Sequence, residues 1–454
     1  MKNNYPRKSR LKRVSNFLRR ELRWFLPGLG VKRWLLLILA GVTLVAVGFA
    51  YFLLDIYRTA PENWFLPVIS TLALRFLDRP LRIIIFGSAG LGFIIWGIWG
   101  LNKTLLKPFM KPGKHVLDTV TAYRKRERGP RVVAIGGGNG LSTLLRGLKH
   151  HTNNITAIVT VADDGGSSGE LRKSVGILPP GDIRNCLAAL SDDEELLSQI
   201  FQYRFGSAVS KDGHAFGNLF ITALTDITGS FEEAVAESSR VLATRGRVLP
   251  ATLHDVRLIA EIDLPQEQKQ VQVRGESQIT NSNGKIKRVW LEPNNPLAFP
   301  PAIQALLSAD LILVGPGSLF TSLLPNLLVH DLADALKMSK ALKFYVCNVA
   351  TQHGETDGFS AYEHVRVVEK YLHQNIFDLV VCNNANGLPL PEGIKWVTPD
   401  DKLHDNYAVY CSDLIDTQYP WRHDSTKLAQ TIMDLFYERT GPMMYKEGLE
   451  VSTQ

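Results

Sequence analysis

From Arg131 onward, short apolar strands alternate with glycine-rich turns and helices, and this order constrains the fold more than any other feature. Arg131–Gly138 (RVVAIGGG) is typical of a buried strand that ends in glycines, and Leu141–His151 has helical spacing. Ile155–Gly169 predicts a second strand that ends in acidic, glycine and serine residues. Because a strand–helix–strand unit joins parallel strands, the sequence predicts an α/β domain over 131–454, with its ligand at the carboxyl ends of the strands.

A different pattern interrupts this alternation between residues 249 and 292. Short alternating strands flank an Asn-Ser-Asn-Gly turn at Asn281–Gly284, which predicts an antiparallel β-ribbon insertion. The α/β pattern resumes with a buried strand and glycine turn at Ala309–Phe320. It continues to a final amphipathic helix over about residues 425–439.

Two apolar runs precede this domain. Residues 34–54 carry no charge and residues 81–101 carry only Arg82; each run has about the 20 residues needed to cross a bilayer. The flanks are basic, since residues 1–130 hold 23 Lys and Arg against 6 Asp and Glu. We therefore expect a basic arm and two transmembrane helices in the inner (plasma) membrane, in contact with lipid, with both termini and the main domain cytoplasmic. A signal peptide fits less well because a second run follows; buried helices of a soluble core are the other alternative.

The charge and the cysteines exclude other classes of protein. Residues 131–454 hold 28 Lys and Arg against 38 Asp and Glu, so the net charge of +7 comes from the N-terminal arm. The acidic main domain gives no indication of nucleic acid binding. Four cysteines stand far apart without a Cys-x-x-Cys motif, which predicts reduced thiols and no zinc site. They are Cys186, Cys347, Cys382 and Cys411.

The first glycine loop, Gly136–Ser142, lies between a strand and a helix. Glycines at such a position let the backbone approach an anion, which is then held by free N–H groups at the helix N-terminus. The loop lacks the Gly-Lys-Ser/Thr ending of a P-loop, and Leu141 takes the place of the third glycine of a dinucleotide fingerprint. A tight turn without a ligand is the alternative.

The second loop, Asp163–Arg172, follows the second strand. An acid at this position binds ribose hydroxyls in dinucleotide folds. The adjacent carboxylates of Asp163 and Asp164 are also suited to a divalent cation or to orienting a hydroxyl nucleophile. Asp-Asp-Gly-Gly is in addition a good turn sequence, so a purely structural role stays open.

Later segments add polar candidates. Pro179–Asn185 opens a helix and offers Arg184 for a bidentate phosphate contact or a surface ion pair. Asn218 is a candidate for recognising the ligand through its side-chain amide. His214 alone is interpreted as a structural residue. Gly315–Ser318 is a third loop between a buried strand and a helix. No Ser/His/Asp order or HExxH motif indicates hydrolysis.

No catalytic residue and no metal ligand is assigned from the sequence. The candidate ligand-binding residues all belong to these loops, with one late arginine added. They are Gly136, Gly137, Gly138, Asn139, Gly140, Leu141, Asp163, Asp164, Ser167, Ser168, Asp182, Arg184, Asn185, Asn218, Gly315, Gly317, Ser318 and Arg422.

Six motifs together resemble the gluconeogenesis factor family, which is related to the 2-phospho-L-lactate transferases of deazaflavin cofactor synthesis. The resemblance covers about residues 131–440 in the expected order and leaves out the first 130 residues, since typical members begin at the first strand and are soluble. Asn139 stands where Thr is commoner. The motifs are GGGNGLSTLLRGLK, VTVADDGGSSGELR, PPGDIRN, GNLF, GPGSLFTSLLPNLLV and NVATQHGETDGFSAYEHV.

The resemblance implies a Rossmann-like fold that binds UDP-N-acetylglucosamine. It also implies a role in cell shape and envelope synthesis during growth on gluconeogenic carbon sources. The glycine loops, Asp163, Asp164 and Asn218 would line the ligand cleft, and Arg422 would reach the ligand. Homo-oligomer formation and envelope-synthesis proteins as partners stay open.

Three functions follow as hypotheses. The first is a nucleotide-sugar sensor or regulator without catalysis. The second is a transferase of the phospholactate type, in which Asp163 or Asp164 with Mg²⁺ helps a hydroxyl attack a nucleotide-activated phosphoryl group. The third, an NAD-dependent oxidoreductase, is disfavoured by the missing third glycine and the lack of an obvious proton donor.

Overall fold

The computed structural model describes residues 39, 42–44, 46, 49–50, 77–106, 126–192, 194–205, 213–264, 269–282 and 284–441. The chain divides into two compact units. One comprises residues 1–124 with 444–454, and the other comprises residues 125–443. The second unit holds all the predicted ligand loops.

The second unit is built on a seven-stranded sheet in the order β10-β9-β8-β7-β1-β2-β3, in which every neighbouring pair is parallel. The predicted α/β fold with a parallel sheet is therefore confirmed. From β1 the chain moves outward to β2 and β3 and then returns to β7 on the opposite side, so the strand order reverses between β1 and β7. The strands are β1 (Val132–Gly136), β2 (Ile155–Val159), β3 (Arg247–Pro250), β7 (Leu311–Val314), β8 (Leu342–Val346), β9 (Leu379–Asn383) and β10 (Val409–Ser412).

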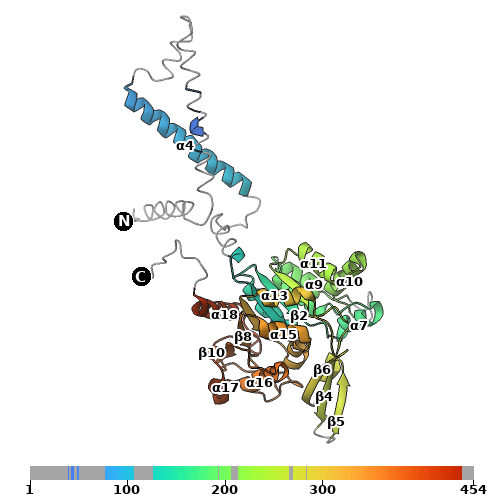
Figure 1. The fold of residues 1–454 in the computed structure, drawn as a ribbon. Coiled ribbons are helices and arrows are strands. Elements are labelled where there is room, and N and C mark those ends of the chain that lie inside the picture. Colours follow the sequence, from blue (N-terminus) through green and yellow to red (C-terminus); the bar gives the residue numbers. More distant parts are fainter. Residues whose placement is uncertain are drawn as a thin grey trace, which may run out of the picture. The chain divides into compact units, whose positions relative to one another are not determined.

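Helices cover the sheet, and their apolar faces form one core with it (Figure 1). In α6 the four leucines at helical spacing are fully buried, and α6 packs on α8 and α18. Gly147 lies at this contact, because a Cβ there would come within 2.0 Å of the Ser425 carbonyl oxygen. The helices are α6 (Gly138–Leu148), α7 (Gly166–Val175), α8 (Gly181–Leu190), α9 (Glu194–Gln202), α10 (Phe216–Thr228), α11 (Phe231–Val241), α13 (Pro300–Ser308), the π-helix η3 (Leu319–Leu323), α14 (Leu324–Leu327), α15 (His330–Met338), α16 (Ala361–Leu372), α17 (Asp401–Asn406) and α18 (Ser425–Thr440).

A small antiparallel sheet projects from this body (Figure 1). Its order is β5-β4-β6, from β4 (Arg257–Leu264), β5 (Lys269–Arg274) and β6 (Lys285–Glu292). The sheet lies within the region where the sequence predicts a ribbon. A short helix, α12 (Glu276–Thr280), joins β5 to β6 ahead of the expected turn. This helix points back toward the second glycine loop.

The membrane expectation needs correction. Among the described residues, no helix is both long enough and apolar enough to cross a membrane. The second predicted run lies within α4 (Arg79–Leu106). Most of the run at 34–54 lies outside the described residues. The predictions of two transmembrane helices at 34–54 and 81–101, and of an inner-membrane location, are therefore wrong.

Candidate functional site

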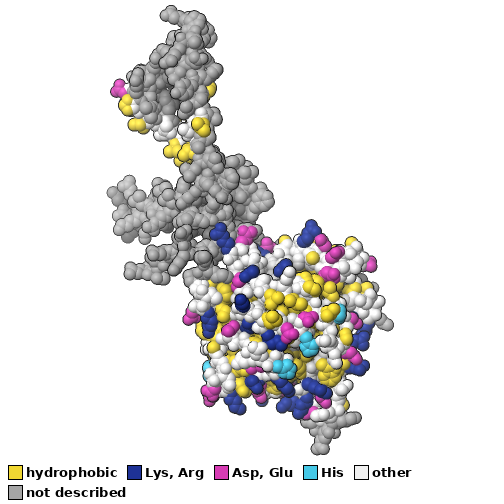
Figure 2. Space-filling model, viewed as in Figure 1, with side chains coloured by type: hydrophobic (Ala, Val, Ile, Leu, Met, Phe, Trp, Pro, Cys, Tyr) yellow, Lys and Arg dark blue, Asp and Glu magenta, His cyan; other side chains and the backbone are white. Residues whose placement is uncertain are grey.

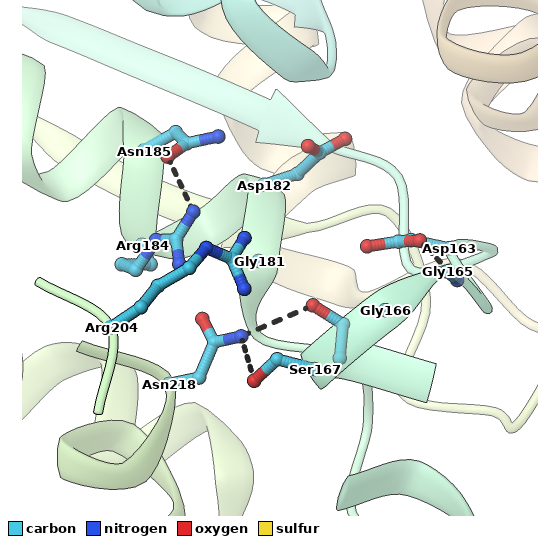
Figure 3. A pocket seen from close by; sticks show the side chains of 11 residues that line it. Asp163, Gly165, Gly166, Ser167, Gly181, Asp182, Arg184, Asn185, Arg204 and Asn218 are labelled. Atoms are coloured by element: carbon cyan, nitrogen blue, oxygen red, sulfur yellow. Dashed lines mark hydrogen bonds between the residues drawn. The ribbon is translucent and has the colours of Figure 1, made fainter. Parts of the chain in front are cut away.

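A pocket of about 240 Å³ lies beyond the carboxyl end of β2, where α7 and α8 begin (Figure 3). All its lining side chains are polar or glycine. They are Asp163, Gly165, Gly166, Ser167, Ser168, Gly181, Asp182, Arg184, Asn185, Arg204 and Asn218. Such a lining suits a small hydrophilic ligand rather than an apolar one.

The two carboxylates of the second loop have different partners. Asp163 lines the pocket, and its Oδ1 accepts a hydrogen bond from the Gly165 N–H at 2.8 Å. Asp164 Oδ1 instead accepts from both the backbone N–H and the hydroxyl of Ser277 in α12, each at 3.0 Å. Asp163 therefore faces the ligand space, whereas Asp164 ties the β insertion to the loop.

Two arginines bring positive charge to the pocket. Arg184 Nη2 donates to Asn185 Oδ1 at 2.9 Å, and its buried Nε has no hydrogen-bond partner among the residues that the structure describes. Arg204 Nη1 donates only to the Gly213 carbonyl, at 3.1 Å, and neither arginine forms an ion pair within the described part of the chain. Burial, followed by the charge of Arg204, lowers the pKa of Arg184. Figure 3 shows both side chains beside Asn218. An anion would relieve this repulsion and occupy the free donors.

The first glycine loop is partly occupied by the protein itself. Asp182 accepts a hydrogen bond from the Gly138 N–H, at the N-terminus of α6, and a Cβ on Gly137 would lie 2.5 Å from Asp182 Oδ2. Burial, followed by the charge of Asp163, raises the pKa of Asp182 to about 7. Its side chain is partly exposed and lines the pocket. The helix N-terminus predicted to hold a ligand phosphate therefore already faces a carboxylate.

The hydrogen-bond donors of the third glycine loop are also bonded to other groups of the protein. The Gly317 N–H donates to Asn348 Oδ1 at 3.1 Å, and Asn348 Nδ2 donates to the Gly317 carbonyl at 2.9 Å. The Ser318 hydroxyl donates to Gln352 Oε1 at 2.6 Å. A Cβ on Gly140 would lie 2.6 Å from the Pro316 carbonyl oxygen, so this loop packs directly on the first.

Further carboxyl groups surround these loops. Burial and the charges of Asp163, Asp182, Glu355 and Asp164, in that order, raise the pKa of the half-buried Glu276 to about 9. Burial raises the pKa of Glu355, which is 5% exposed, to about 7. No three His, Cys, Asp or Glu side chains in the described ranges come together as metal ligands.

The predicted residues fall into two groups. Seven of them line the pocket: Asp163, Ser167, Ser168, Asp182, Arg184, Asn185 and Asn218. The loops Gly136–Leu141 and Gly315–Ser318 pack next to it without lining it, and Asp164 faces α12. Arg422 lies elsewhere, with its guanidinium 5.5 Å from the centre of the Tyr419 ring.

Sequence reasoning missed Arg204 and Glu276. Arg204 reaches the pocket because it pairs with Ala215 in an isolated β-bridge between α9 and α10. Glu276 belongs to the insertion and follows a strand that is not part of the main sheet. No local motif marks either residue, although Gly275, with φ of 96°, signals the sharp turn that precedes Glu276.

The parallel sheet with a reversal of strand order, together with glycine turns at the carboxyl ends of β1 and β7, defines a Rossmann-like α/β protein. Residues 132–430 match the family described as 2-phospho-L-lactate transferase CofD. The chain belongs to this family, within its gluconeogenesis factor branch, and the resemblance seen in the six motifs is confirmed.

Individual relatives agree over long stretches. The gluconeogenesis factor of Bacillus subtilis is 44% identical over 327 residues, covering 68% of this chain and 99% of its own. A Nostoc relative that bears the gluconeogenesis-factor name is 47% identical over 386 residues, covering 82% and 81%. A Clostridium acetobutylicum relative, 38% identical, covers 92% of this chain and 93% of its own, so its match includes part of the segment before Arg131.

A solved structure supports the fold. The crystal structure of a Bacillus halodurans protein is 41% identical to this chain, with a TM-score of 0.62. It covers 67% of this chain and 99% of its own.

Proposed function

We propose that this protein is a nucleotide-sugar-binding regulator whose ligand is UDP-N-acetylglucosamine. In this role it supports cell shape and envelope synthesis during growth on gluconeogenic carbon sources. The proposal rests on membership of the gluconeogenesis factor family and on the polar pocket beside the second glycine loop. This is a binding role, because sensing a ligand requires no chemical reaction of the pocket residues.

The observation that carries the proposal is the pair of arginines, Arg184 and Arg204, neither of which forms an ion pair with a carboxylate of the described residues. Arg184 and Arg204 converge on one side of the pocket, and the buried Nε of Arg184 has no partner among the described residues. A diphosphate supplies several anionic oxygens that two guanidinium groups can bind. Asp163, on the other side of the same pocket, is suited to accept hydrogen bonds from ribose or sugar hydroxyls.

The test is a calorimetric titration of the full chain with UDP-N-acetylglucosamine, GDP and NAD. We expect saturable binding of the nucleotide sugar and a loss of about tenfold to a hundredfold in affinity for Arg184→Ala and Arg204→Ala. Arg240→Ala is the matched control, because Arg240 is exposed on α11 and pairs with Glu237. Binding of NAD alone, or equal affinity in all four proteins, would contradict the proposal.

A second candidate is a transferase of the phospholactate type, the activity in the name of the matched family. The observation that favours it is the group of carboxyl groups with raised pKa values near the pocket, which is suited to proton transfer during phosphoryl transfer. Incubation of the full chain with a nucleotide-activated phospholactate tests it. Release of free nucleotide would move the assignment from regulator to enzyme.

A further inference from the structure

Ser167, His214 and Glu170 form a chain of interacting side chains at the edge of the pocket. Ser167 Oγ lies 3.0 Å from His214 Nδ1, and His214 Nε2 lies 3.7 Å from Glu170 Oε2. Ser167 is 4% exposed and lines the pocket. The chain order serine, glutamate, histidine also occurs in α/β-hydrolases, and Ser167 stands at the centre of a Gly-x-Ser-x-Gly sequence, Gly165–Gly169. The three residues meet because the N-terminus of α7 packs against the segment that precedes α10.

The other contacts of Ser167 decide the direction of its hydrogen bond. Asn218 Nδ2 donates to Ser167 Oγ at 3.1 Å, and the Ala215 backbone N–H points to the same oxygen at 3.4 Å. A hydroxyl oxygen has two acceptor lone pairs and one proton, so with both lone pairs engaged its proton is directed to His214 Nδ1. His214 is then the tautomer with its proton on Nε2, on the side of Glu170. In this arrangement the serine hydroxyl donates to an unprotonated imidazole nitrogen, as a nucleophilic serine does before it loses its proton.

The surroundings of Ser167 suit an anionic electrophile. Ser167 stands in the first turn of the ten-residue helix α7, whose N-terminus has no side-chain cap. Arg184 and Arg204 line the same pocket. Asn218, which is 2% exposed, keeps its Oδ1 without a partner in the described part of the chain. The pocket thus brings hydrogen-bond donors and two arginines to the serine, together with the carboxylates of Asp163 and Asp182.

We propose that Ser167 is a nucleophile, with His214 as its general base, toward a phosphate ester or anhydride held in this pocket. As the bond from Ser167 Oγ to phosphorus forms, the bond from phosphorus to the leaving oxygen breaks. The hydroxyl proton passes to His214 Nδ1, and the imidazolium returns it to the leaving oxygen. The products are phosphoserine and the free alcohol or phosphate. Glu170 is a positioning residue, whose charge stabilises the imidazolium at 3.7 Å.

The inference goes beyond ligand binding, and its test is independent of the nucleotide sugar. The full chain is treated with a fluorophosphonate, whose tetrahedral phosphorus reacts with activated serines and releases fluoride. Labelling is followed by intact mass, and the site is identified by peptide mapping. We expect one label, on Ser167, and none in Ser167→Ala. Ser174→Ala, on the exposed end of the same helix, is the control and keeps the label.

The histidine and glutamate variants separate a catalytic from a structural role. In His214→Gln the labelling rate should fall about a hundredfold or more, whereas His404→Gln, at an exposed position, should not change it. Glu170→Gln should slow labelling, and Glu170→Asp should restore part of the rate. Circular dichroism checks that each variant is folded. No label, a label on Ser168, or an unchanged rate in folded His214→Gln overturns the proposal, whatever the nucleotide-sugar titration gives.

Discussion

Gly140 and Pro316 are in backbone contact: a Cβ on Gly140 would lie 2.6 Å from the Pro316 carbonyl oxygen and 2.9 Å from the Cα of Gly317. The loops after β1 and β7 therefore support each other across the point where the strand order reverses. This close backbone contact explains why position 140 needs glycine.

This contact predicts that Gly140→Ala destabilises the protein. Alanine in a helix gains about 1 kcal/mol over glycine, but the clashing atoms are backbone and cannot rotate away, so a net loss of about 1–3 kcal/mol is expected. Denaturant unfolding measures it. Gly387→Ala is the control, since no atom lies within 4 Å of its Cβ position. A Gly140→Ala protein as stable as the wild type would show that the loops are not in contact.

Glu355 predicts a dependence of stability on pH. Its carboxyl is buried beneath η3, where Oε2 accepts from the Phe320 N–H at 3.1 Å and Oε1 accepts from the Thr321 hydroxyl at 2.8 Å. Its pKa is raised to about 7 from an ordinary value of 4.5. The folded state therefore holds the proton more tightly, and this stabilisation is complete below about pH 4.5 and lost as the pH rises through 7.

The loss amounts to about 3 kcal/mol at most between these limits. In Glu355→Gln the free energy of unfolding should fall less steeply between pH 5 and pH 8 than in the wild type. Urea unfolding at several pH values provides the comparison. Parallel curves for the two proteins would mean that Glu355 titrates as it does in water.

The hydrogen bonds from Ser277 to Asp164, which join the β insertion to the second loop, predict a local effect on stability. Ser277→Ala removes the hydroxyl that donates to Asp164 Oδ1 at 3.0 Å and keeps the backbone N–H bond. A loss of about 1.5–3 kcal/mol is expected, because the acceptor is charged. Hydrogen exchange should quicken in α12 and around Asp164. Thr280→Ala, whose hydroxyl bonds only the Glu276 carbonyl of its own helix, is the control. Equal exchange in both variants would argue against the tie.

Asn348 holds the third loop, and Asn348→Ala should loosen it. The variant removes both hydrogen bonds to Gly317, and the unpaired backbone groups should cost about 1–3 kcal/mol. Asn348→Asp keeps the acceptor for the Gly317 N–H but not the donor, so its stability should lie between those of the wild type and the alanine variant. Thermal unfolding gives the order. If Asn348→Asp were no more stable than Asn348→Ala, the hydrogen bond from the Gly317 N–H would contribute nothing to stability.

The local pattern was sufficient to predict the strands, the glycine turns and the polar candidates at the ends of β1, β2 and β7, because each depends on a few adjacent residues. It did not show that Asp182 would face Gly138 or that Asn348 would hold Gly317, since both pairs join segments brought together only by the sheet order. His214 was assigned a structural role because its serine partner precedes it by 47 residues.

The prediction of a transmembrane helix at 81–101 was wrong for a different reason. The length and low charge of this run were taken as sufficient, but no described helix is both long enough and apolar enough to cross a membrane. Arg422 was expected from the resemblance to reach the ligand, but it does not line the pocket, and its guanidinium lies 5.5 Å from the centre of the Tyr419 ring. Such a contact depends on where a loop folds back, which the local sequence does not show.

The raised pKa values beside the pocket have a consequence for ligand affinity. Asp182 titrates near pH 7 and Glu276 near pH 9, and negative charge entering the pocket raises both pKa values further. An anionic ligand would therefore take up protons from the buffer as it binds, and its affinity would increase as the solution becomes more acidic. The heat of binding would vary with the ionisation enthalpy of the buffer. Occupancy of this pocket is thus coupled to the proton concentration around it.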